Sequence, residues 1–166
     1  GMEVVIVRLP LVYGPGVKAN YKSLLEALWR RWPLPLAAAN SNRRSLVYLG
    51  NLVDLLTVCL KHPAAVGRTF LVSDGEDMST VELLQRQGQA LERPPKLWNW
   101  SPEFVRFVLR LLRREAVYDR LFGSLQVDTE ETRQALDWKP PISVENGLAK
   151  TANSYRTLVE LNAGNV

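Results

Sequence analysis

The sequence has few of the residues that build metal sites and disulfides. Among its 166 residues it has one cysteine, Cys59, and one histidine, His62. A single cysteine excludes an internal disulfide and is typical of a reducing compartment, so we expect a cytoplasmic protein. Zinc sites usually draw on several cysteines and histidines, so this composition argues against one. We expect both residues to be structural.

Long apolar runs are also missing, since no stretch approaches the roughly 20 residues that cross a bilayer. Hydrophobic residues nevertheless make up 46% of the chain. This is enough for about one domain with a sizeable core. The net charge of +4 favours anionic partners only slightly. It suits a nucleotide diphosphate, and we expect no nucleic-acid partner.

Apolar periodicity and capping signals predict a mixed α/β chain in which helices dominate. Asn51 is expected to cap the second helix, and Ser79 and Glu82 form a capping box for the third. The predicted helices span residues 20–32, 51–61, 79–91, 101–114, 128–136 and 143–158, and the predicted strands span residues 4–7, 33–36, 44–49, 69–72 and 97–100. The second helix is expected to bury Leu52, Leu55, Leu56 and Leu60.

The first sixteen residues organise the rest of the prediction. The run from Val4 to Val7 is apolar on both faces, as in a strand that is covered on both sides of a parallel sheet. One strand alone cannot bury both of its faces. Either this strand joins a small local sheet, or the chain is the rear part of something larger, which is the interpretation we favour.

Several short segments, in order along the chain, resemble one family of enzymes. They are RLPLVYGPG at residues 8–16 with Asn20 after it, RRSLVYL at 43–49, TFLVSDG at 69–75, RL at 120–121, and LDWKPP at 136–141 with residues 144–148 after it. Together they resemble the extended short-chain dehydrogenase/reductases, the NAD-dependent nucleotide-sugar epimerase/dehydratase family to which UDP-glucose 4-epimerase belongs.

The resemblance implies how the chain is divided. Residues 4–7 and 70–72 would be late strands of a doubly wound sheet, and most of the remainder would be the small, mostly helical substrate-binding lobe. Residues 1–166 are then one fragment of α/β class, the C-terminal portion of an extended short-chain dehydrogenase/reductase. The N-terminal NAD-binding Rossmann half would be absent from it.

Two motifs that carry this family's chemistry are missing from the sequence. It has no G-x-G-x-x-G or G-x-x-G-x-x-G turn, which would place the NAD pyrophosphate at a helix N-terminus. No tyrosine is followed by lysine four positions later, so the family's Tyr-x-x-x-Lys pair is missing too. NAD is therefore expected as the cofactor of the full-length protein, with its N-terminal half as this chain's partner. This chain alone is expected neither to bind NAD nor to catalyse a reaction.

The resemblance assigns three residues to the diphosphate of a nucleotide sugar, with a UDP-sugar favoured. Arg44, with Arg43 as a rival in register, and Arg120 match arginines that hold the diphosphate or ribose. A planar guanidinium can bind phosphate oxygens through two hydrogen bonds. Asn20 matches an asparagine that contacts the diphosphate at a helix N-terminus. The alternatives are surface arginines in ion pairs and a plain N-cap at Asn20.

The resemblance also assigns contacts to the uracil ring and the nicotinamide. The extended segment with Leu34 and Leu36 would run along the uracil, where its backbone groups could meet the base edge. Leu36 takes the place of an aromatic residue in some relatives and would offer only apolar contact. Pro10 matches the position where the backbone meets the nicotinamide carboxamide. The alternatives are a helix-ending loop and a strand-ending proline.

The function implied is that of the substrate-binding part of a UDP-hexose 4-epimerase-like enzyme in cell-surface polysaccharide metabolism. A dehydratase or keto-reductase of the same family, or a non-catalytic binding protein with this fold, are the alternatives. A homodimer is a further possibility. Residues 104–114 read as a helix that mixes apolar residues with arginines. We favour a lobe helix packed on its neighbours over one that lies on an anionic membrane.

Overall fold

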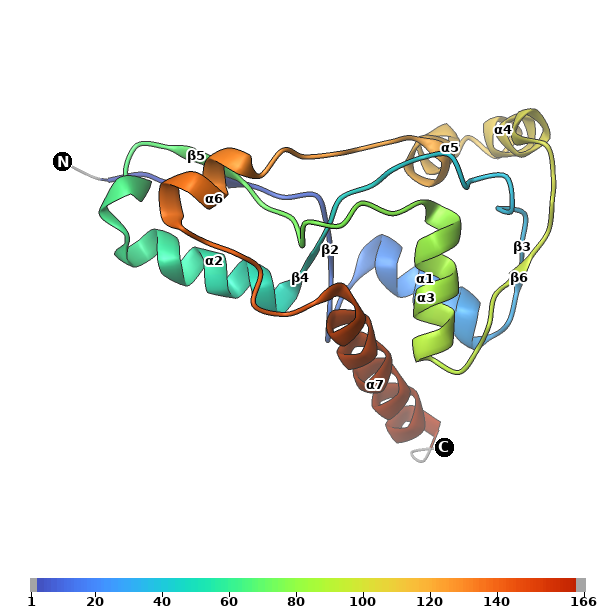
Figure 1. The fold of residues 1–166 in the computed structure, drawn as a ribbon. Helices are drawn as coiled ribbons and strands as arrows, with labels where there is room; N and C mark the ends of the chain where they lie inside the picture. Colours follow the sequence, from blue (N-terminus) through green and yellow to red (C-terminus); the bar gives the residue numbers. More distant parts are fainter. Residues whose placement is uncertain (1–2, 164–166) are drawn as a thin grey trace.

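The computed structural model describes residues 3–163, in which short strands alternate with helices (Figure 1). The strands are β1 (Ile6–Arg8), β2 (Leu11–Tyr13), β3 (Pro33–Leu34), β4 (Leu46–Tyr48), β5 (Thr69–Leu71) and β6 (Lys96–Leu97). The helices are α1 (Ala19–Trp29), α2 (Leu49–Lys61), α3 (Thr80–Ala90), α4 (Pro102–Leu111), α5 (Glu115–Phe122), α6 (Glu130–Leu136) and α7 (Val144–Ala163), with a 3-10 turn at Pro63–Ala65. This is the mixed α/β chain that the sequence predicts.

The strands of the described residues form three separate parallel pairs. β1 pairs with β5, which sets Val7 opposite Phe70. β2 pairs with β4, which sets Val12 opposite Val47, and β3 pairs with β6. Each pair is joined through at least one helix, as parallel pairing requires.

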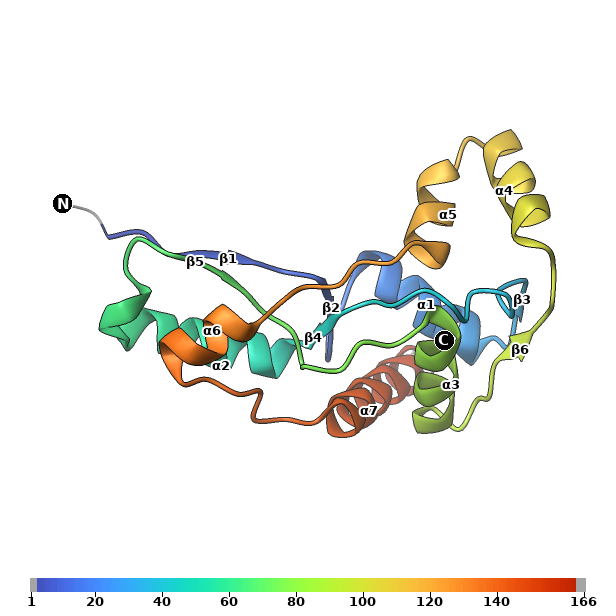
Figure 2. The ribbon, with the colours of Figure 1, turned by 45° about the horizontal axis from the view of Figure 1, so that its top comes forward.

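The pairs lie at different places along an elongated molecule. Figures 1 and 2 show β1 and β5 at one end beside α2 and α6, and β3 and β6 at the other end. α3 packs against both α1 and α7, and α5 packs against α4. The α4–α5 hairpin stands at the far corner of the molecule in both views.

The first strand differs from the prediction in its bounds and its burial. β1 begins at Ile6, and the side chains of Val4 and Ile6 are 48% and 50% exposed, so the strand is not covered on both faces by the described residues. The sequence prediction also missed β2. Strand β1 ends before the buried Pro10, and β2 begins at the next residue. A strand of three residues is too short for its alternating pattern to be detected in the sequence.

The second helix begins earlier than predicted, with Tyr48 rather than Asn51 as its N-cap. Asn51 instead lies fully buried in the first turn, where its side chain bonds residues of other segments. Leu52 and Leu55 are buried as predicted, but Leu56 and Leu60 are 41% and 87% exposed. The prediction was wrong there because these two leucines lie on a face that no described segment covers.

The predicted capping box of α3 is confirmed, whereas one helix was missed. Ser79 and Glu82 form the predicted capping box of α3, and Ser101 caps α4. Helix α5 was not predicted. Arg113 adopts a left-handed conformation, with φ of 55°, which ends α4 and lets a new helix begin at Glu115.

Two clusters of buried side chains form the core. One gathers around Tyr13 and Tyr21, between β2, α1, α3 and α7. The other gathers around Phe70 and Trp138, between α2, β5 and α6. Cys59 belongs to the second cluster, where burial raises the pKa of its thiol.

A half-buried carboxylate, that of Asp74, joins the two clusters at the ends of β2 and β4. Asp74 accepts hydrogen bonds from the Tyr13 hydroxyl at 2.8 Å, the Tyr48 backbone N–H at 3.0 Å and the Asn51 side chain at 2.8 Å. The Asn51 amide also bonds the carbonyl and the N–H of Ile142, just before α7. Burial raises the pKa of Asp74, although the three donors oppose the rise.

The two tyrosines of this junction are packed against glycines. The rings of Tyr13 and Tyr48 lie 5.6 Å apart between their centroids. A Cβ on Gly147 of α7 would lie 2.7 Å from the Tyr13 hydroxyl oxygen and 3.0 Å from a Tyr48 ring carbon. Helix α7 can therefore approach β2 and β4 this closely only with glycine at this position.

Replacing Gly147 with alanine should lower the free energy of unfolding by about 1–3 kcal/mol, as overpacking of a core does. The sign of this change in unfolding free energy tests the close packing, because in an unobstructed helix replacing glycine with alanine stabilises by about 1 kcal/mol. Urea denaturation measures the difference, with Asn146→Ala on the exposed side of the same turn as the control. A stabilised Gly147→Ala protein would contradict the close approach of α7.

Replacing Asp74 with alanine should cost about 3 kcal/mol of unfolding free energy, because three buried donors would lose their acceptor. Thermal and urea denaturation measure this loss. Asp119→Ala, at an exposed position on α5, is the matched control and should change stability by less than about 0.5 kcal/mol. Equal stabilities of the two variants would show that Asp74 does not hold the junction together.

Candidate functional site

A cavity of about 380 Å³ lies between α1, α3, α5 and the segment after β3. Its volume falls in the range of small-molecule sites, about 300–1,000 Å³. Four residues that the sequence singled out line it, namely Asn20, Leu34, Leu36 and Arg120. The remaining lining residues are Ser23, Leu24, Ala27, Thr80, Leu84, Arg114, Val117 and Leu121.

The rim of the cavity carries polar and cationic groups. The Arg120 guanidinium, from α5, donates to the side-chain oxygen of Asn20, from α1, at 3.4 Å, although the two residues lie 100 positions apart in the sequence. Arg114 adds a second cation to the lining. Both arginine side chains are exposed, so neither guanidinium is buried away from an incoming ligand.

Asn20 does not cap the helix that carries it. Lys18 occupies the N-cap position of α1 and makes no side-chain capping bond, and Asn20 follows within the first turn. The alternative of a plain N-cap at Asn20 is therefore wrong. Its side chain is directed at Arg120 of the opposite wall instead.

The floor of the cavity is apolar at Leu34 and Leu36. The backbone groups that could meet a ligand here are already engaged, since the Leu34 carbonyl accepts from the N–H groups of Leu36 and Trp98, both at 2.8 Å. The Leu36 carbonyl accepts from the Ala39 N–H at 2.9 Å. These two residues therefore offer the cavity their side chains rather than a free backbone edge.

Arg44 stands behind the cavity wall rather than in its lining. Its guanidinium donates to the backbone carbonyls of Arg120 and Gly123 at the end of α5. Its own backbone bridges to Met78 and Leu125. Burial lowers the pKa of this guanidinium below its usual value. The contacts make Arg44 an anchor of the helix that carries Arg120.

Sequence reasoning missed a second anchor, Asn42. This buried side chain donates to the Thr80 hydroxyl at 3.0 Å and to the carbonyls of Leu121 and Gly123 at 3.3 Å and 3.2 Å. Its oxygen accepts from the Thr80 N–H at 3.1 Å. Four hydrogen bonds thus join α3 to the end of α5, and no local sequence signal marks them.

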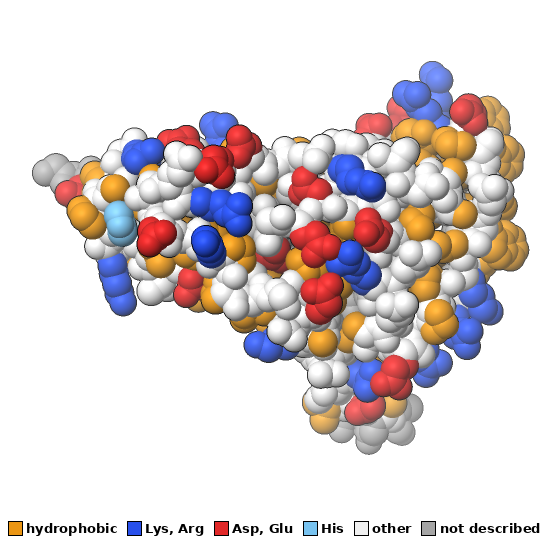
Figure 3. Space-filling view, viewed as in Figure 1, with side chains coloured by type: hydrophobic (Ala, Val, Ile, Leu, Met, Phe, Trp, Pro, Cys, Tyr) orange, Lys and Arg blue, Asp and Glu red, His pale blue; other side chains and the backbone are white. Residues whose placement is uncertain are grey.

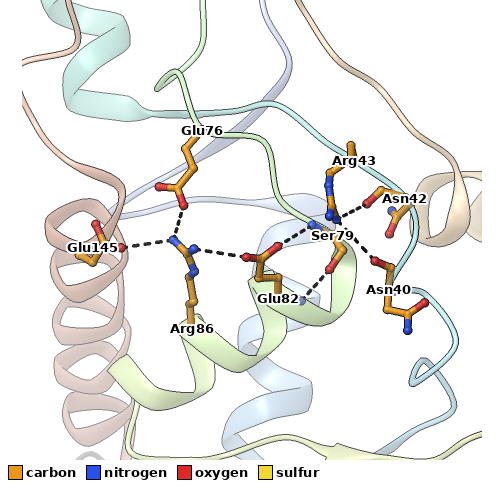
Figure 4. Close-up of polar contacts among 8 residues, drawn as sticks. All are labelled: Asn40, Asn42, Arg43, Glu76, Ser79, Glu82, Arg86 and Glu145. Atoms are coloured by element: carbon orange, nitrogen blue, oxygen red, sulfur yellow. Dashed lines mark hydrogen bonds and ion pairs between the residues drawn. The ribbon is translucent and has the colours of Figure 1, made fainter.

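The rival arginine, Arg43, is turned toward its own loop. Figure 4 shows its guanidinium beside the backbone carbonyls of Asn40 and Asn42, at 3.5 Å and 3.2 Å. It does not reach α5 as Arg44 does. Of the two neighbours, Arg44 is the one connected to the cavity wall.

Helix α3, which forms one wall, is tied to α7 through Arg86. Figure 4 shows its guanidinium between Glu76, Glu82 and Glu145, at 2.7 Å, 3.3 Å and 3.2 Å. These ion pairs are partly exposed, and each contributes little on its own. As a cluster they fix the direction of α3 relative to α7.

Pro10 lies apart from this cavity. It is buried between β1 and β2 and is not among the lining residues. The structure thus brings together four of the six residues that the resemblance assigned, adds Arg44 as an anchor and leaves Pro10 elsewhere. The nicotinamide contact of Pro10 stays a prediction.

The residues of this chain do not fit an NAD site. The Gly-rich turn and the Tyr-x-x-x-Lys pair, which the resemblance assigns to NAD binding and acid/base chemistry, are missing from the sequence. Within residues 3–163 no three His, Cys, Asp or Glu side chains are grouped to hold a metal ion. None of the helices in that range is long and apolar enough to cross a membrane.

The chain is similar in sequence to curated epimerases. It is 43% identical over 156 residues to a UDP-glucose 4-epimerase of Vibrio cholerae, a match covering 93% of this chain and 47% of that protein. It is 29% identical over 153 residues to a UDP-glucose 4-epimerase of Mycolicibacterium smegmatis, covering 87% and 43%. The chain therefore spans about half the length of these relatives. No protein-family model matches it.

Solved structures share the fold. An epimerase from Methanothermobacter thermautotrophicus has a TM-score of 0.76 at 19% identity, covering 96% of this chain and 45% of that one. A UDP-glucose 4-epimerase from Thermotoga maritima, solved with UDP-glucose, has a TM-score of 0.70 at 16% identity, covering 95% and 47%. A dTDP-glucose 4,6-dehydratase from Bacillus anthracis, solved with NAD, has a TM-score of 0.68 at 16% identity, covering 95% and 46%.

The parallel strand pairs and the helical lobe give the chain the fold of these solved structures, and its sequence homology to the curated epimerases makes it part of an extended short-chain dehydrogenase/reductase. Its homologues within that class are UDP-glucose 4-epimerases. The chain corresponds to the C-terminal portion of the nucleotide-sugar epimerase/dehydratase family, as the sequence predicted.

Replacing Asn42 with alanine should lower the unfolding free energy by about 2–3 kcal/mol, because Thr80 and the end of α5 lose buried partners. Hydrogen exchange of the α5 amides should accelerate more than that of the α2 amides, since the loss is local to the cavity wall. Asn40→Ala, at an exposed position in the same loop, is the control. Unchanged exchange in α5 would contradict the anchoring role of Asn42.

Proposed function

We propose that this chain is the nucleotide-sugar-binding part of an NAD-dependent sugar epimerase of the UDP-hexose 4-epimerase type. The observation that carries the proposal is the meeting of Asn20 and Arg120 at the rim of one cavity floored by Leu34 and Leu36. The homology to UDP-glucose 4-epimerases supports the same substrate class.

The distribution of polarity matches the chemistry of a nucleoside diphosphate sugar. Two phosphates carry the charge, and the guanidinium groups of Arg120 and Arg114 can bind their oxygens at the rim. The base is flat and less polar, and the side chains of Leu34 and Leu36 offer it apolar contact. In this proposal Arg44 is a positioning residue, because its own donors hold α5 in place.

Binding at the diphosphate would act on the reaction from a distance. Interactions with parts of the substrate that do not react can fix the orientation of the part that does. The chain holds no acid/base pair of the family, so the reacting sugar would have to face groups supplied by another segment.

We place that segment, the NAD-binding Rossmann half, against the uncovered faces of β1 and α2. Val4 and Ile6 on one side and Val53, Leu56 and Leu60 on the other are between 41% and 87% exposed. Exposed apolar surface of this extent marks a contact with another element. NAD belongs to the assembled protein in this proposal, and the cytoplasm, suggested by the single cysteine, is its location.

The first test is calorimetric titration of the chain with UDP, UDP-GlcNAc and NAD. UDP and UDP-GlcNAc should bind and NAD should not. Arg120→Ala should weaken UDP binding at least about tenfold, since a hydrogen bond to a charged group contributes about 1.5–3 kcal/mol. Its melting temperature should stay within about 1 °C of wild type, because the side chain is exposed.

The matched control is Arg8→Ala, an exposed arginine on β1 outside the cavity. It should bind UDP as the wild type does. A folded chain that binds no UDP, or that loses the same affinity in both variants, would refute the assignment of this cavity to a nucleotide sugar.

A further inference from the structure

A continuous ridge of exposed apolar side chains runs from the end of β6 along α4. We call the aromatic ridge the residues Trp98, Trp100, Phe104, Phe107 and Leu111, whose side chains are 51%, 38%, 51%, 64% and 74% exposed. Ring contacts connect its first members, with centroids 6.4 Å apart for the two tryptophans and 5.2 Å from the second to Phe104. The proposed nucleotide-sugar cavity uses none of these residues.

Helical geometry explains why the ridge stays uncovered. Residues 104, 107 and 111 follow a spacing of three and four, so they line one side of α4. Val105, which lies on another side of the helix, is only 5% exposed. Helix α4 thus packs by one side only and presents its longest apolar side chains to the outside.

Basic side chains border the ridge. The segment from Lys96 to Arg114 contains five basic residues and one acidic residue, so its net charge of +4 equals that of the whole chain. Arg106 lies over the ring of Tyr118, 5.6 Å from its centroid, and exposed Arg110 is 3.6 Å from Glu115. The arginine stems can extend beside apolar side chains while their charged ends reach an anionic layer.

The position of the ridge suits a flat partner. Figures 1 and 2 place α4 at an outer corner of the molecule, beyond the strand pairs. Figure 3 shows hydrophobic side chains along this edge with Lys and Arg groups close by. A convex corner can contact an extended surface without any rearrangement of the rest of the chain.

We propose that the aromatic ridge docks α4 in the plane of an anionic lipid surface, which is the alternative that the sequence alone disfavoured for this helix. Helices that lie in a membrane interface combine Trp, Phe and Leu on one side with Lys and Arg on the other. Tryptophan is enriched at the membrane–water boundary. Ten residues of helix span only about 15 Å, half of a bilayer core, so the contact is peripheral.

Charge favours this occupant over a second copy of the chain. Docking two ridges together would bring two segments of net charge +4 into contact, and like charges oppose such an interface. Anionic headgroups reverse the sign of that interaction, and each basic residue near such a surface contributes about 1 kcal/mol.

Flotation with vesicles of phosphatidylcholine and about 30% phosphatidylglycerol tests the proposal, with pure phosphatidylcholine as the comparison. The wild-type chain should bind the anionic vesicles at least tenfold more tightly than the neutral ones. The double variant Phe107→Ser with Leu111→Ser should lose at least tenfold of that binding. The pair Leu158→Ser and Leu161→Ser, on the exposed side of α7, is the matched control and should bind as the wild type does.

A second variant keeps the test decisive if the first one disturbs the fold. Arg110→Ala with Arg113→Ala should weaken binding to anionic vesicles and leave binding to neutral ones unchanged. Tryptophan emission should shift to shorter wavelength with anionic vesicles in the wild type and less in both variants. Each variant should bind UDP as the wild type does. A loss of vesicle binding can therefore be distinguished from a failure of the proposed UDP site.

Three outcomes overturn the proposal. The first is a wild-type chain that binds anionic vesicles no better than neutral ones. The second is equal vesicle binding by the ridge variant and the α7 control. The third is a lipid-free dimer, seen by sedimentation velocity, that the ridge variant dissociates, because the ridge would then be an interface between copies.

Discussion

The two ends of the molecule are held together by the hydrogen bonds to the half-buried carboxylate of Asp74. This carboxylate accepts from Tyr13 at the end of β2, from the backbone of Tyr48 at the end of β4 and from Asn51 in α2. The Asn51 side chain also forms hydrogen bonds with the backbone of Ile142, which lies just before α7. Withdrawal of the carboxylate from water raises its pKa, and three donors compensate for lost hydration. Helices α1 and α7 take their directions from this junction.

The cavity depends on that junction at one wall and on α5 at the other. Helix α1 leaves the end of β2 with Asn20 in its first turn, while Arg44 and Asn42 hold the last carbonyls of α5. The two walls meet where Arg120 contacts Asn20. A cationic rim over an apolar floor is thereby assembled from segments that are remote in sequence, and its geometry is fixed by anchors that do not touch the interior.

The α4–α5 hairpin presents two different surfaces. Arg114 and Arg120 contribute to the rim of the cavity, whereas Phe104, Phe107 and Leu111 form part of the aromatic ridge. The left-handed turn between the helices separates the faces, since it redirects the chain between α4 and α5. β1 and α2, which carry exposed apolar side chains, lie at the opposite end of the molecule (Figure 2). The contacts proposed for the two ends therefore do not compete.

Features that depend on local physics can be predicted from the sequence alone. Ser79 caps α3 through a hydrogen bond three residues ahead, and Ser101 caps α4 in the same way, so both were predictable. The resemblance carried by the order of the motifs predicted the family, and it predicted that Asn20 and Arg120 belong to one site. The role of Asn51 as a buried bridge rather than a cap follows only from the folded chain, since its partners lie 23 and 91 positions away. The three-residue strand β2, the burial of α2's leucines and the anchoring role of Asn42 likewise depend on what packs against them, which no local pattern encodes.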